Sequence, residues 1–334
     1  MKESYLYKKI SQSKTSCYLC SHMCTIAHNA FGKCNVRKNI GGKLFSLNYG
    51  QLITENIDPI EKKPLFHFLP GSMSYSIACA GCNFKCFFCQ NYQISQIAEG
   101  EAENRGVYYN PDDIVKKALR YDCKSISYTY TEPTVFFEFA FDTAVIAKEN
   151  KIKNVFVTNG YMTKEAIDKI APYLDAANID LKSFTDDFYR KYAGARLKPV
   201  LENIEYLKSR EIWVEVTTLL IPGLNDSKEE IRAMAEFLKN ISAELPWHLS
   251  AYYPQYKSSI KATETDKITE AVAIGKSAGL KYVYAGNIPA NNLENSFCPA
   301  CGKLLISRHG YNIMENNIED GRCRFCKGRI NGFF

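Results

Sequence analysis

Twelve of the thirteen cysteines stand in three groups of four, and this grouping constrains the fold more than any other feature of the sequence. Clustered thiols in a chain of 334 residues more often bind metal than form disulfides. A secreted disulfide scaffold would spread its cysteines through a much shorter chain. The sequence therefore predicts metal sites in a reducing compartment. Only Cys123 is solitary; the groups are Cys17, Cys20, Cys24 and Cys34, then Cys79, Cys82, Cys86 and Cys89, then Cys298, Cys301, Cys323 and Cys326.

The composition is that of a globular protein with a substantial core, because 46% of the residues are hydrophobic and 23% are charged. The net charge of +6 is mild; it can attract an acidic partner but does not indicate nucleic-acid binding. The N-terminus MKESYLYKKI lacks the apolar segment of a signal peptide. Glu138 and Asp142 interrupt the most apolar stretch, VFFEFAFDTAVIA, which is too short to span a membrane. We therefore expect a cytoplasmic protein without a membrane segment.

Short apolar runs alternate with helix-like segments between the second and third cysteine groups. This alternation predicts βαβ units and a parallel sheet. Capping residues and helical periodicity predict helices that begin near Asn110, Thr163 and Ser227, and one more over Thr265–Ala278. The predicted strands are Tyr75–Ala80, Ser125–Tyr130, Asn154–Thr158, Ala177–Leu181, Ile212–Leu219, Trp247–Tyr252 and, more weakly, Lys281–Ala285.

About six such units in roughly 180 residues favour an α/β fold with an open (β/α)6 partial barrel, since a full eight-unit barrel typically needs about 250 residues. We assign the barrel to residues 75–290, between a four-cysteine segment with its connector (1–74) and a C-terminal segment (291–334). Turn signals in residues 41–74 predict an irregular or short-stranded connector. Ligands bind at the carboxyl ends of such strands, so the candidate residues follow each strand.

The middle group contains the motif CxxxCxxC at Cys82, Cys86 and Cys89, and Cys79 stands outside it. Thiolates bind soft metals, and this spacing lets three sulfurs face one centre. A [4Fe–4S] cluster held by three protein sulfurs leaves one iron open, and an open position distinguishes a reactive metal site from a structural one. A structural zinc or an electron-transfer cluster is the alternative. We expect Cys79 to be a core thiol or to lie beside the site.

The segment Cys82–Cys89, CNFKCFFC, resembles the signature of radical S-adenosylmethionine (SAM) enzymes, with Phe88 as the aromatic residue before the third cysteine. The resemblance implies that the open iron binds the methionine part of SAM. It implies that an electron from the reduced cluster cleaves the sulfonium and releases a 5′-deoxyadenosyl radical, which abstracts hydrogen from a substrate. A flavodoxin- or ferredoxin-type reductant is implied as the electron source. The protein positions and shields this cofactor chemistry.

The segment YTYTEP, after the second predicted strand, extends the resemblance to Glu132. Many family members have Gly-Gly-Glu here, and the resemblance implies that the acid binds the amino group of SAM. Tyr130 and Thr131 replace the two glycines, so only Glu132 is carried over. The alternative is a glutamate that merely stabilises a helix N-terminus.

Two further strand ends match glycyl-radical activating enzymes, TNG at Asn159 and DLK at Asp180 and Lys182. The resemblance implies that these three residues contact SAM, and that Phe88 and the strand YAGNI (284–288) flank its adenine. Residues two apart on a strand share one face, so Asp180 and Lys182 can contact one zwitterionic ligand. The alternatives are a plain Asn-Gly turn and an internal ion pair.

A narrower resemblance rests on DPIEKKPLFHFLPG (58–71), TYTEPT, TNGY, NIDLK, LIPGLND (220–226) and YAGNI. With both terminal cysteine groups, these segments are similar to the radical SAM member of the AmmeMemoRadiSam system, a group related to pyruvate formate-lyase activating enzymes. The resemblance implies AMMECR-type and Memo-like partners. It also implies hydrogen abstraction from an unidentified substrate, for which a protein or peptide is one option. A glycyl-radical enzyme activase is the alternative. A non-catalytic electron carrier or zinc-binding module is the alternative of a different class.

The C-terminal group consists of two CxxC knuckles, Cys298 with Cys301 and Cys323 with Cys326, each with a nearby glycine. Their separation is close to that of known zinc sites, and two knuckles complete a closed four-cysteine site. We therefore predict a structural zinc ribbon, with a rubredoxin-like iron site as the alternative.

The N-terminal group, Cys17, Cys20, Cys24 and Cys34, is less decisive. Four thiolates suffice for zinc or for a fully ligated auxiliary iron–sulfur cluster. The compact CxxCxxxC favours the cluster, whereas the absence of a second CxxC weakens a zinc ribbon. Both metals remain open, with zinc slightly preferred.

Overall fold

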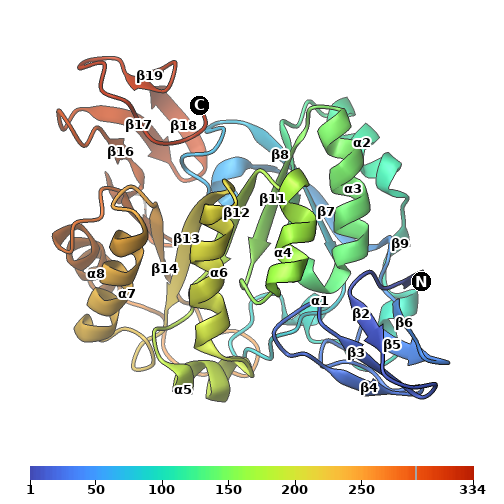
Figure 1. The fold of residues 1–334 in the computed structure, drawn as a ribbon. Helices are drawn as coiled ribbons and strands as arrows, with labels where there is room; N and C mark the ends of the chain where they lie inside the picture. The colour runs from blue at the N-terminus through green and yellow to red at the C-terminus, as the bar shows by residue number, and fades with distance from the viewer. Residues whose placement is uncertain (290–291) are drawn as a thin grey trace.

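The computed structural model describes residues 1–289 and 292–334, and a large curved sheet forms its centre (Figure 1). Within these residues the sheet has nine strands, in the spatial order β15 (Val283–Gly286), β14 (Trp247–Ala251), β13 (Trp213–Leu220), β12 (Ala176–Asp180), β11 (Lys153–Thr158), β10 (Ser125–Tyr128), β8 (Met73–Cys79), β7 (Gln51–Pro59) and β9 (Val107–Tyr108).

The strands from β15 to β8 in this order are parallel to their neighbours. The structure therefore confirms the predicted α/β class with an open partial barrel. All seven predicted strands are present, and their bounds differ from the prediction by at most two residues. These strands can be recognised in the sequence because both faces of a parallel sheet are buried. Each strand is therefore a continuous apolar run.

The connector differs from the prediction of an irregular or short-stranded segment. It contains β7, a nine-residue strand that pairs antiparallel with β8 from Leu52 opposite Cys79 to Pro59 opposite Met73. Most of the turn signals, such as Gly41-Gly42 and Pro70-Gly71, lie outside this strand, whereas Asp58-Pro59 forms its last two residues. The edge of β8 supplies the hydrogen-bond partners that make this polar segment a strand.

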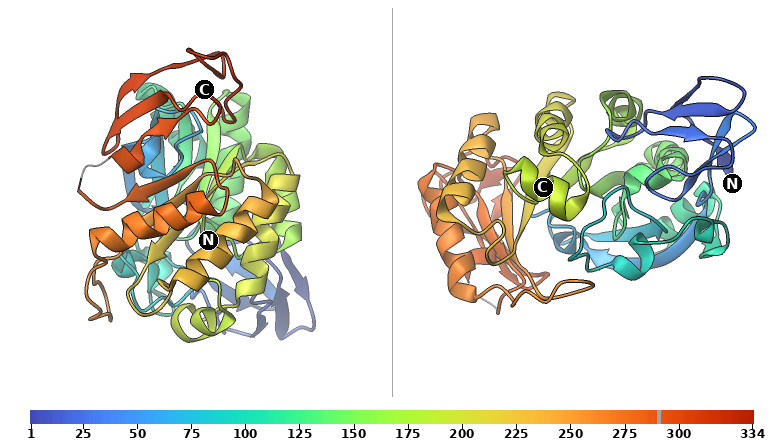
Figure 2. Two further views of the ribbon diagram at one scale, coloured as in Figure 1. Left: turned by 90° about the vertical axis from the view of Figure 1, so that its left-hand side faces the viewer. Right: turned by 90° about the horizontal axis from the view of Figure 1, so that it is seen from below.

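Helices cover the outer face of the sheet, which curves as an open arc when seen from below (Figure 2, right). Asn110, Thr163 and Ser227 cap the helices that follow them, as predicted. Four described helices are missing from the prediction: α1, α3, α5 and α6. The two long ones, α3 and α6, follow Phe136 and Arg196, and neither residue provides a side-chain cap. The α-helices are α1 (Tyr92–Ser95), α2 (Pro111–Arg120), α3 (Phe137–Glu149), α4 (Lys164–Ile170), α5 (Asp186–Phe188), α6 (Leu197–Ser209), α7 (Lys228–Ile241) and α8 (Thr265–Ser277).

The two ends of the chain form small sheets at opposite ends of the molecule in Figure 1. The N-terminal sheets are β1 (Lys2–Glu3), β6 (Lys43–Ser46) and β5 (Arg37–Ile40), and β2 (Tyr7–Lys9), β3 (Lys14–Cys17) and β4 (Thr25–Ala27). The C-terminal sheets are β16 (Ser296–Phe297), β17 (Leu304–His309) and β18 (Asn312–Asn316), and β19 (Ile318–Glu319) and β20 (Arg322–Cys323).

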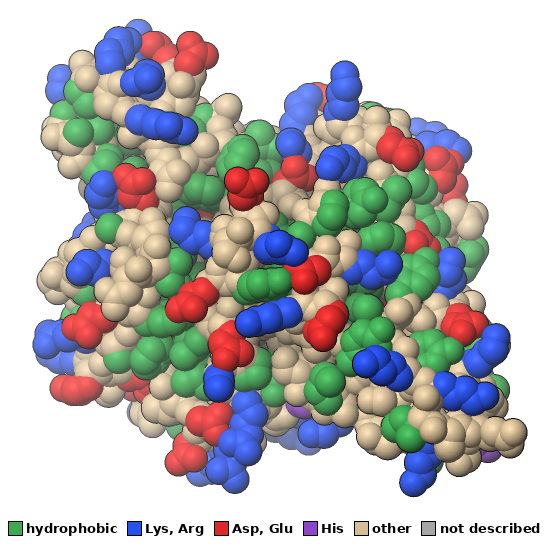
Figure 3. Space-filling model, viewed as in Figure 1, with side chains coloured by type: hydrophobic (Ala, Val, Ile, Leu, Met, Phe, Trp, Pro, Cys, Tyr) green, Lys and Arg blue, Asp and Glu red, His purple; other side chains and the backbone are tan. Residues whose placement is uncertain are grey.

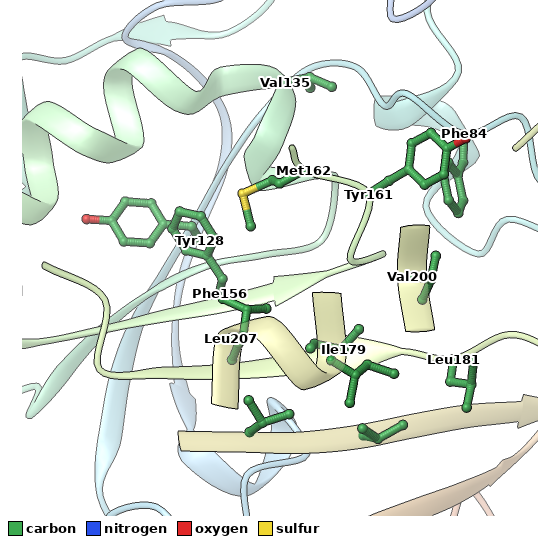
Figure 4. Packing of buried hydrophobic residues seen from close by; sticks show 14 of the residues in the cluster. Phe84, Tyr128, Val135, Phe156, Tyr161, Met162, Ile179, Leu181, Val200 and Leu207 are labelled. Carbon is green, nitrogen blue, oxygen red and sulfur yellow. The ribbon is translucent and has the colours of Figure 1, made fainter. Parts of the chain in front are cut away.

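One apolar cluster links the sheet, its helices and the loops above it (Figure 4). Phe84, from the loop with the middle cysteines, packs edge-on against Tyr161, with ring centroids 5.1 Å apart. Val135 and Met162 are buried in the same cluster. This packing fixes the cysteine loop on the core of the barrel.

Basic and acidic side chains are interspersed on the face that the helices cover (Figure 3). This mixture differs from the single-sign surface that attracts nucleic acid by its field. Among the described residues, no helix combines the length and apolar character needed to cross a membrane.

Candidate active site and metal centres

A cavity of about 570 Å³ lies where the parallel strands end. This volume falls within the range of pockets that hold small molecules and cofactors. The structure brings together in its wall the side chains that sequence analysis placed after separate strands: Cys82, Cys86, Cys89, Phe88, Glu132, Asn159, Asp180 and Lys182.

The loop that carries the three cysteines leaves β8 through a tight turn at Gly81. Its φ of +108° is a conformation that side chains rarely adopt, and a Cβ there would lie 2.5 Å from Val36 Cγ1. Phe84 and Phe88 are buried on either side of the middle cysteine. Backbone geometry and packing together hold the three sulfurs at the cavity wall.

Polar groups of the protein already contact two of these sulfurs. The Phe84 backbone N–H donates to Cys82 Sγ at 3.3 Å, and Asn159 Nδ2 lies 3.8 Å from the same sulfur. Ser95 Oγ lies 3.1 Å from Cys89 Sγ. Donors of this kind stabilise thiolates and tune the metal that they bind. Sequence analysis assigned no role to Ser95, although it ends the segment QNYQIS (90–95) that continues the resemblance after the third cysteine.

The protein surroundings alone favour neutral thiols. Burial raises the pKa of Cys86 to about 11, although the nearby charge of Lys182 opposes this. Burial and, next, the charge of Glu132 raise the pKa of Cys82 well above its usual value. Because metal ligands must be thiolates, metal binding at these positions releases protons.

Glu132 is buried and its carboxylate holds the turn after β11. Its Oε1 accepts hydrogen bonds from the Thr134 backbone N–H at 3.1 Å, Thr134 Oγ1 at 2.5 Å and Thr158 Oγ1 at 2.7 Å, and its Oε2 accepts from Asn159 N at 2.8 Å. Burial nevertheless raises the pKa of this carboxyl. Glu132 directly precedes the 3₁₀ turn Pro133–Phe136, and its contact with Thr134 stabilises the start of that turn. This is the alternative role considered for Glu132 in the sequence analysis. The same side chain also lines the cavity.

Asp180 and Lys182 form an ion pair, with Lys182 Nζ 2.8 Å from Asp180 Oδ2. Burial on its own would lower the pKa of Lys182, but the charges of Asp180 and Cys86 raise it above its usual value. The lysine is therefore a permanent cation beside the cysteine loop. The two residues thus form the internal ion pair that was the alternative to a SAM contact. Both also lie in the cavity wall.

The adenine-flanking residues are only partly as expected. Phe88 lines the cavity and packs against Phe87, with ring centroids 5.3 Å apart. In YAGNI, Asn287 lines the cavity. Tyr284 instead is buried away from it and contacts His67 Nε2 at 2.6 Å.

A charged cluster in the cavity wall was not identified from the sequence. Lys62 and Lys63 both contact Asp58, at 2.8 and 2.7 Å, and the Tyr130 hydroxyl donates to the same carboxylate. Burial, partly offset by Asp58, lowers the pKa of Lys63 to about 8. The charged residues of DPIEKKP are evident in the sequence. Their contact with Tyr130 is not, because Tyr130 lies 72 positions from Asp58.

Cys79 ends β8 and is fully buried in the main apolar cluster, outside the set of cavity-lining residues. Burial raises the pKa of its thiol above the usual value. This is the environment of a core thiol, one of the two positions expected for it.

The C-terminal four cysteines converge closely. Among the described residues they are the one group of three or more cysteine, histidine or carboxylate ligands whose ligand atoms all lie within 4.8 Å of one another. Cys298 Sγ lies 3.6 Å from Cys326 Sγ, and Cys301 Sγ lies 3.8 Å from Cys323 Sγ. Four converging thiols can hold one metal ion.

The N-terminal four cysteines line a small cavity of about 20 Å³ beside the turn after β11. The segment is held there by backbone hydrogen bonds from Ser21 N to Tyr161 O at 2.9 Å and from Thr163 N to Leu19 O at 3.1 Å. All thirteen cysteines of the chain are free thiols.

Residues 76–238 match the model of the radical SAM superfamily. The chain belongs to the radical SAM superfamily. This radical SAM enzyme is 43% identical over 334 residues to "Uncharacterized protein MJ0808" of Methanocaldococcus jannaschii, covering 99% of both chains. It is 26% identical over 167 residues to the pyruvate formate-lyase-activating enzyme of Clostridium pasteurianum, covering 48% of this chain and 67% of the relative.

The solved structure of Streptococcus suis SuiB bound to S-adenosylmethionine shares the fold, with a TM-score of 0.50 and 16% identity over 68% of this chain and 52% of SuiB. The family and the activating-enzyme relative show that the protein is an enzyme of the radical SAM type, as predicted. The family implies a [4Fe–4S] cluster and SAM as cofactors.

Proposed function

We propose that this radical SAM enzyme holds a [4Fe–4S] cluster at Cys82, Cys86 and Cys89, cleaves SAM reductively and abstracts hydrogen from a protein or peptide substrate. The main observation in support is that these thiols share one cavity of about 570 Å³ with polar residues from three other strand ends. Three protein ligands leave one iron open for SAM. The bound cofactors supply the electron transfer and the 5′-deoxyadenosyl radical.

The chain's own residues position SAM. The Asp180–Lys182 pair presents both charges that a zwitterionic methionine group needs. Glu132 holds Asn159 in place through Oε2, and this oxygen accepts one hydrogen bond, so it is the one with a lone pair left for the amino group. Phe88 and Asn287 lie in the wall where the adenine is expected.

The test is anaerobic reconstitution with iron and sulfide, followed by dithionite and SAM. We expect 5′-deoxyadenosine and a change in the electron paramagnetic resonance (EPR) spectrum of the cluster when SAM is added. The Cys82→Ala/Cys86→Ala/Cys89→Ala variant is expected to show neither. A wild-type protein that contains the cluster but gives no deoxyadenosine and no spectral change would support the electron-carrier alternative and contradict the enzyme function.

Lys182→Met tests the SAM contact. We expect SAM to bind at least about tenfold more weakly, or about 1.4 kcal/mol, because the variant removes a buried cation from the cavity wall. Titration calorimetry of the reconstituted enzyme measures the affinity for SAM. Lys281→Met is the matched control, since Lys281 Nζ also lies 2.8 Å from its carboxylate partner, Glu244, but outside the cavity wall. Equal affinity in the two variants would remove Lys182 from the SAM site.

We also propose that the enzyme is the radical SAM member of an AmmeMemoRadiSam system and acts in the cytoplasm with AMMECR-type and Memo-like partners and a flavodoxin- or ferredoxin-type reductant. The narrower sequence motifs support this assignment. Deoxyadenosine formation measured with each candidate partner, followed by mass spectrometry of that partner, tests it. Stimulation by neither protein would contradict the partnership.

A glycyl-radical enzyme activase is the second candidate, because one relative is a pyruvate formate-lyase-activating enzyme. An activase leaves a persistent organic radical on its protein partner, which EPR detects. Modification of the partner without such a radical favours the first proposal.

For the C-terminal cysteines we propose a structural zinc. Tetrahedral Zn–S bonds of about 2.3 Å place sulfurs about 3.8 Å apart, and the two measured separations are 3.6 and 3.8 Å. Cys301 and Cys326 are exposed, so the site is at the surface of the ribbon and not at the SAM cavity. Metal analysis distinguishes zinc from the rubredoxin-like iron alternative.

A further inference from the structure

The three cysteine groups differ in how closely their sulfurs approach. Among the described residues, only the C-terminal group has three or more ligand atoms within 4.8 Å of one another, so the N-terminal four are spaced more widely. Sulfurs around one zinc ion stand about 3.8 Å apart. The proposed cluster ligands Cys82, Cys86 and Cys89 are also absent from the closely spaced group. The N-terminal and middle groups are therefore both spaced more widely than the C-terminal group, for which we propose zinc.

The N-terminal thiols face one enclosed space. The cavity that they line has a volume of about 20 Å³. Cys17 and Cys34 are buried, and Leu19 and Ile26 complete an apolar wall. Thiolates in a space of this kind suit a soft metal group.

Two buried N–H donors in the same wall have no hydrogen-bond partner among the described residues. Arg37 uses its terminal nitrogens for Ser4 and Glu138, which leaves Nε unpaired, and Asn83 uses Oδ1 to accept from Asn159 Nδ2 at 2.7 Å, which leaves Nδ2 unpaired. Both residues line the cavity and are 2% exposed. Buried donors normally find acceptors, so these two point to a ligand with acceptor atoms. The inorganic sulfides of an iron–sulfur cluster are such acceptors, beyond the four thiolates.

Asn83 also connects this cavity with the SAM cavity. It directly follows Cys82, and its backbone oxygen contacts His22 Nε2 of the N-terminal segment at 2.8 Å. Asn159 contacts both Asn83 Oδ1 and Cys82 Sγ. A single residue thus separates the N-terminal cavity from the first ligand of the proposed catalytic cluster.

We infer that Cys17, Cys20, Cys24 and Cys34 bind a second [4Fe–4S] cluster, with Arg37 Nε and Asn83 Nδ2 as hydrogen-bond donors to its sulfurs. Four protein ligands leave no iron open, so this site does not bind SAM or substrate. We thus choose the cluster, which the sequence left open beside a slightly preferred zinc. The identity of this metal group does not depend on the proposed function of the SAM cavity.

Metal analysis of the Cys82→Ala/Cys86→Ala/Cys89→Ala protein, reconstituted anaerobically, is the first test. We expect about four irons and one zinc per chain, and an EPR signal of a reduced [4Fe–4S] cluster. Two zincs without iron would overturn the inference, and so would one zinc without iron. Because the catalytic ligands are absent in this protein, failure of SAM cleavage in the wild type cannot affect the result.

Two further substitutions in that background assign the iron. Adding Cys20→Ser and Cys24→Ser is expected to remove the remaining iron. The matched control Cys123→Ser is expected to retain it, since Cys123 lies three residues after the end of α2 and outside both cavities. Retained iron in the double-serine protein would contradict the ligand assignment. Circular dichroism confirms that each protein is folded before the metals are counted.

Asn83→Asp, again without the catalytic cysteines, tests the donor without removing a ligand. Aspartate keeps the acceptor for Asn159 but removes the N–H donor and adds negative charge, so we expect a lower reduction potential of the remaining cluster. Asn56→Asp is the control because Asn56 is exposed, donates to Thr54 Oγ1 and lies outside the lining of the N-terminal cavity. Equal potentials in the two proteins would overturn the role of Asn83.

Discussion

Tyr130 shows how one residue can connect distant parts of this site. Its φ of +62° lies in the left-handed region, which costs a non-glycine residue about 1 kcal/mol or more. Two contacts explain why the conformation persists: the hydroxyl donates to Asp58, and Lys63 Nζ lies 4.5 Å from the ring centroid. The tyrosine thus holds the cationic connector at the cavity wall.

Tyr130→Phe is expected to lower the free energy of unfolding by about 1–3 kcal/mol. The variant removes a hydrogen bond to a largely buried carboxylate while the ring stays over Lys63. Urea denaturation with an unchanged m-value measures this difference. Tyr253→Phe is the control because its hydroxyl donates to the uncharged Asn287 O at an exposed position. A loss no larger than in the control would contradict the role of the Asp58 contact.

The N-terminal segment is attached to the barrel by a buried ion pair between β5 and α3. Arg37 Nη2 lies 2.7 Å from Glu138 Oε2 and Nη1 lies 3.0 Å from Oε1, and both side chains are almost fully buried. Burial alone would lower the pKa of Arg37, but Glu138 raises it above the usual value, so the cation persists. Breaking one partner of such a pair leaves an uncompensated charge.

Glu138→Gln is therefore expected to lower the free energy of unfolding by about 3–5 kcal/mol. Glu202→Gln serves as the control, since Glu202 and Lys198 are 3.7 Å apart on the surface of α6. Its effect is expected to stay within about 1 kcal/mol. Chemical denaturation of both variants checks the difference, and equal stabilities would show that the buried pair is not needed for attachment.

The C-terminal ribbon has little core of its own apart from its cysteines, Leu305, Ile306 and Ile330. A metal at the four thiols therefore supplies much of its stability, as in small metal-binding domains. We expect Cys301→Ser to lose the metal and to expose the amides of β17 and β18 to rapid hydrogen exchange, while those of β11 and β12 stay protected. Mass-detected exchange measures both regions. Unchanged protection of the ribbon would contradict a structural metal.

At the scale of the whole molecule, a hydrogen-bonded chain joins the ribbon to the connector and the barrel. Arg308 Nη1 donates to Ser296 Oγ at 2.9 Å, Ser296 contacts the Tyr284 hydroxyl at 2.7 Å, and Tyr284 contacts His67 Nε2 at 2.6 Å. His67 Nδ1 lies 2.9 Å from Asn331 O. A neutral imidazole satisfies this chain, because Nδ1–H donates to the carbonyl and Nε2 accepts from the tyrosine.

This arrangement predicts acid sensitivity. Burial lowers the pKa of His67 to about 4, although the charge of Glu215 opposes the shift, while an unfolded histidine has a pKa of about 6.5. Between these values the unfolded chain binds a proton that the folded protein excludes, so stability falls as the pH is lowered. We expect this histidine to account for about 3 kcal/mol between pH 7 and pH 4.

Denaturation of the wild type and of His67→Gln across this pH range measures the contribution, and the variant is expected to have the shallower dependence. NMR titration of the His67 ring provides a second measurement that does not require the variant to fold. A ring that titrates near pH 6.5 in the folded protein would contradict the prediction.

The sequence by itself determined the barrel strands, the capped helices and the cavity residues that directly follow a strand. Each of these depends on short-range order: an apolar run, a capping side chain, or a polar residue that directly follows a strand. Parallel strands then bring their carboxyl ends to one edge, which is why Glu132, Asn159 and Asp180 lie in one wall. The uncapped α6 lacked such a local signal.

Only the tertiary structure decided the strand pairing of the connector, the contact of Tyr130 with Asp58 and the attachment of the N-terminal segment by Arg37 and Glu138. These partners lie far apart in sequence, and each polar side chain gains its partner only when folding buries both. The distances between the sulfurs of one cysteine group also depend on the folded structure and cannot be read from the sequence. Sequence spacing alone left zinc and a cluster open at the N-terminal group, because loops of equal length can hold sulfurs at different separations.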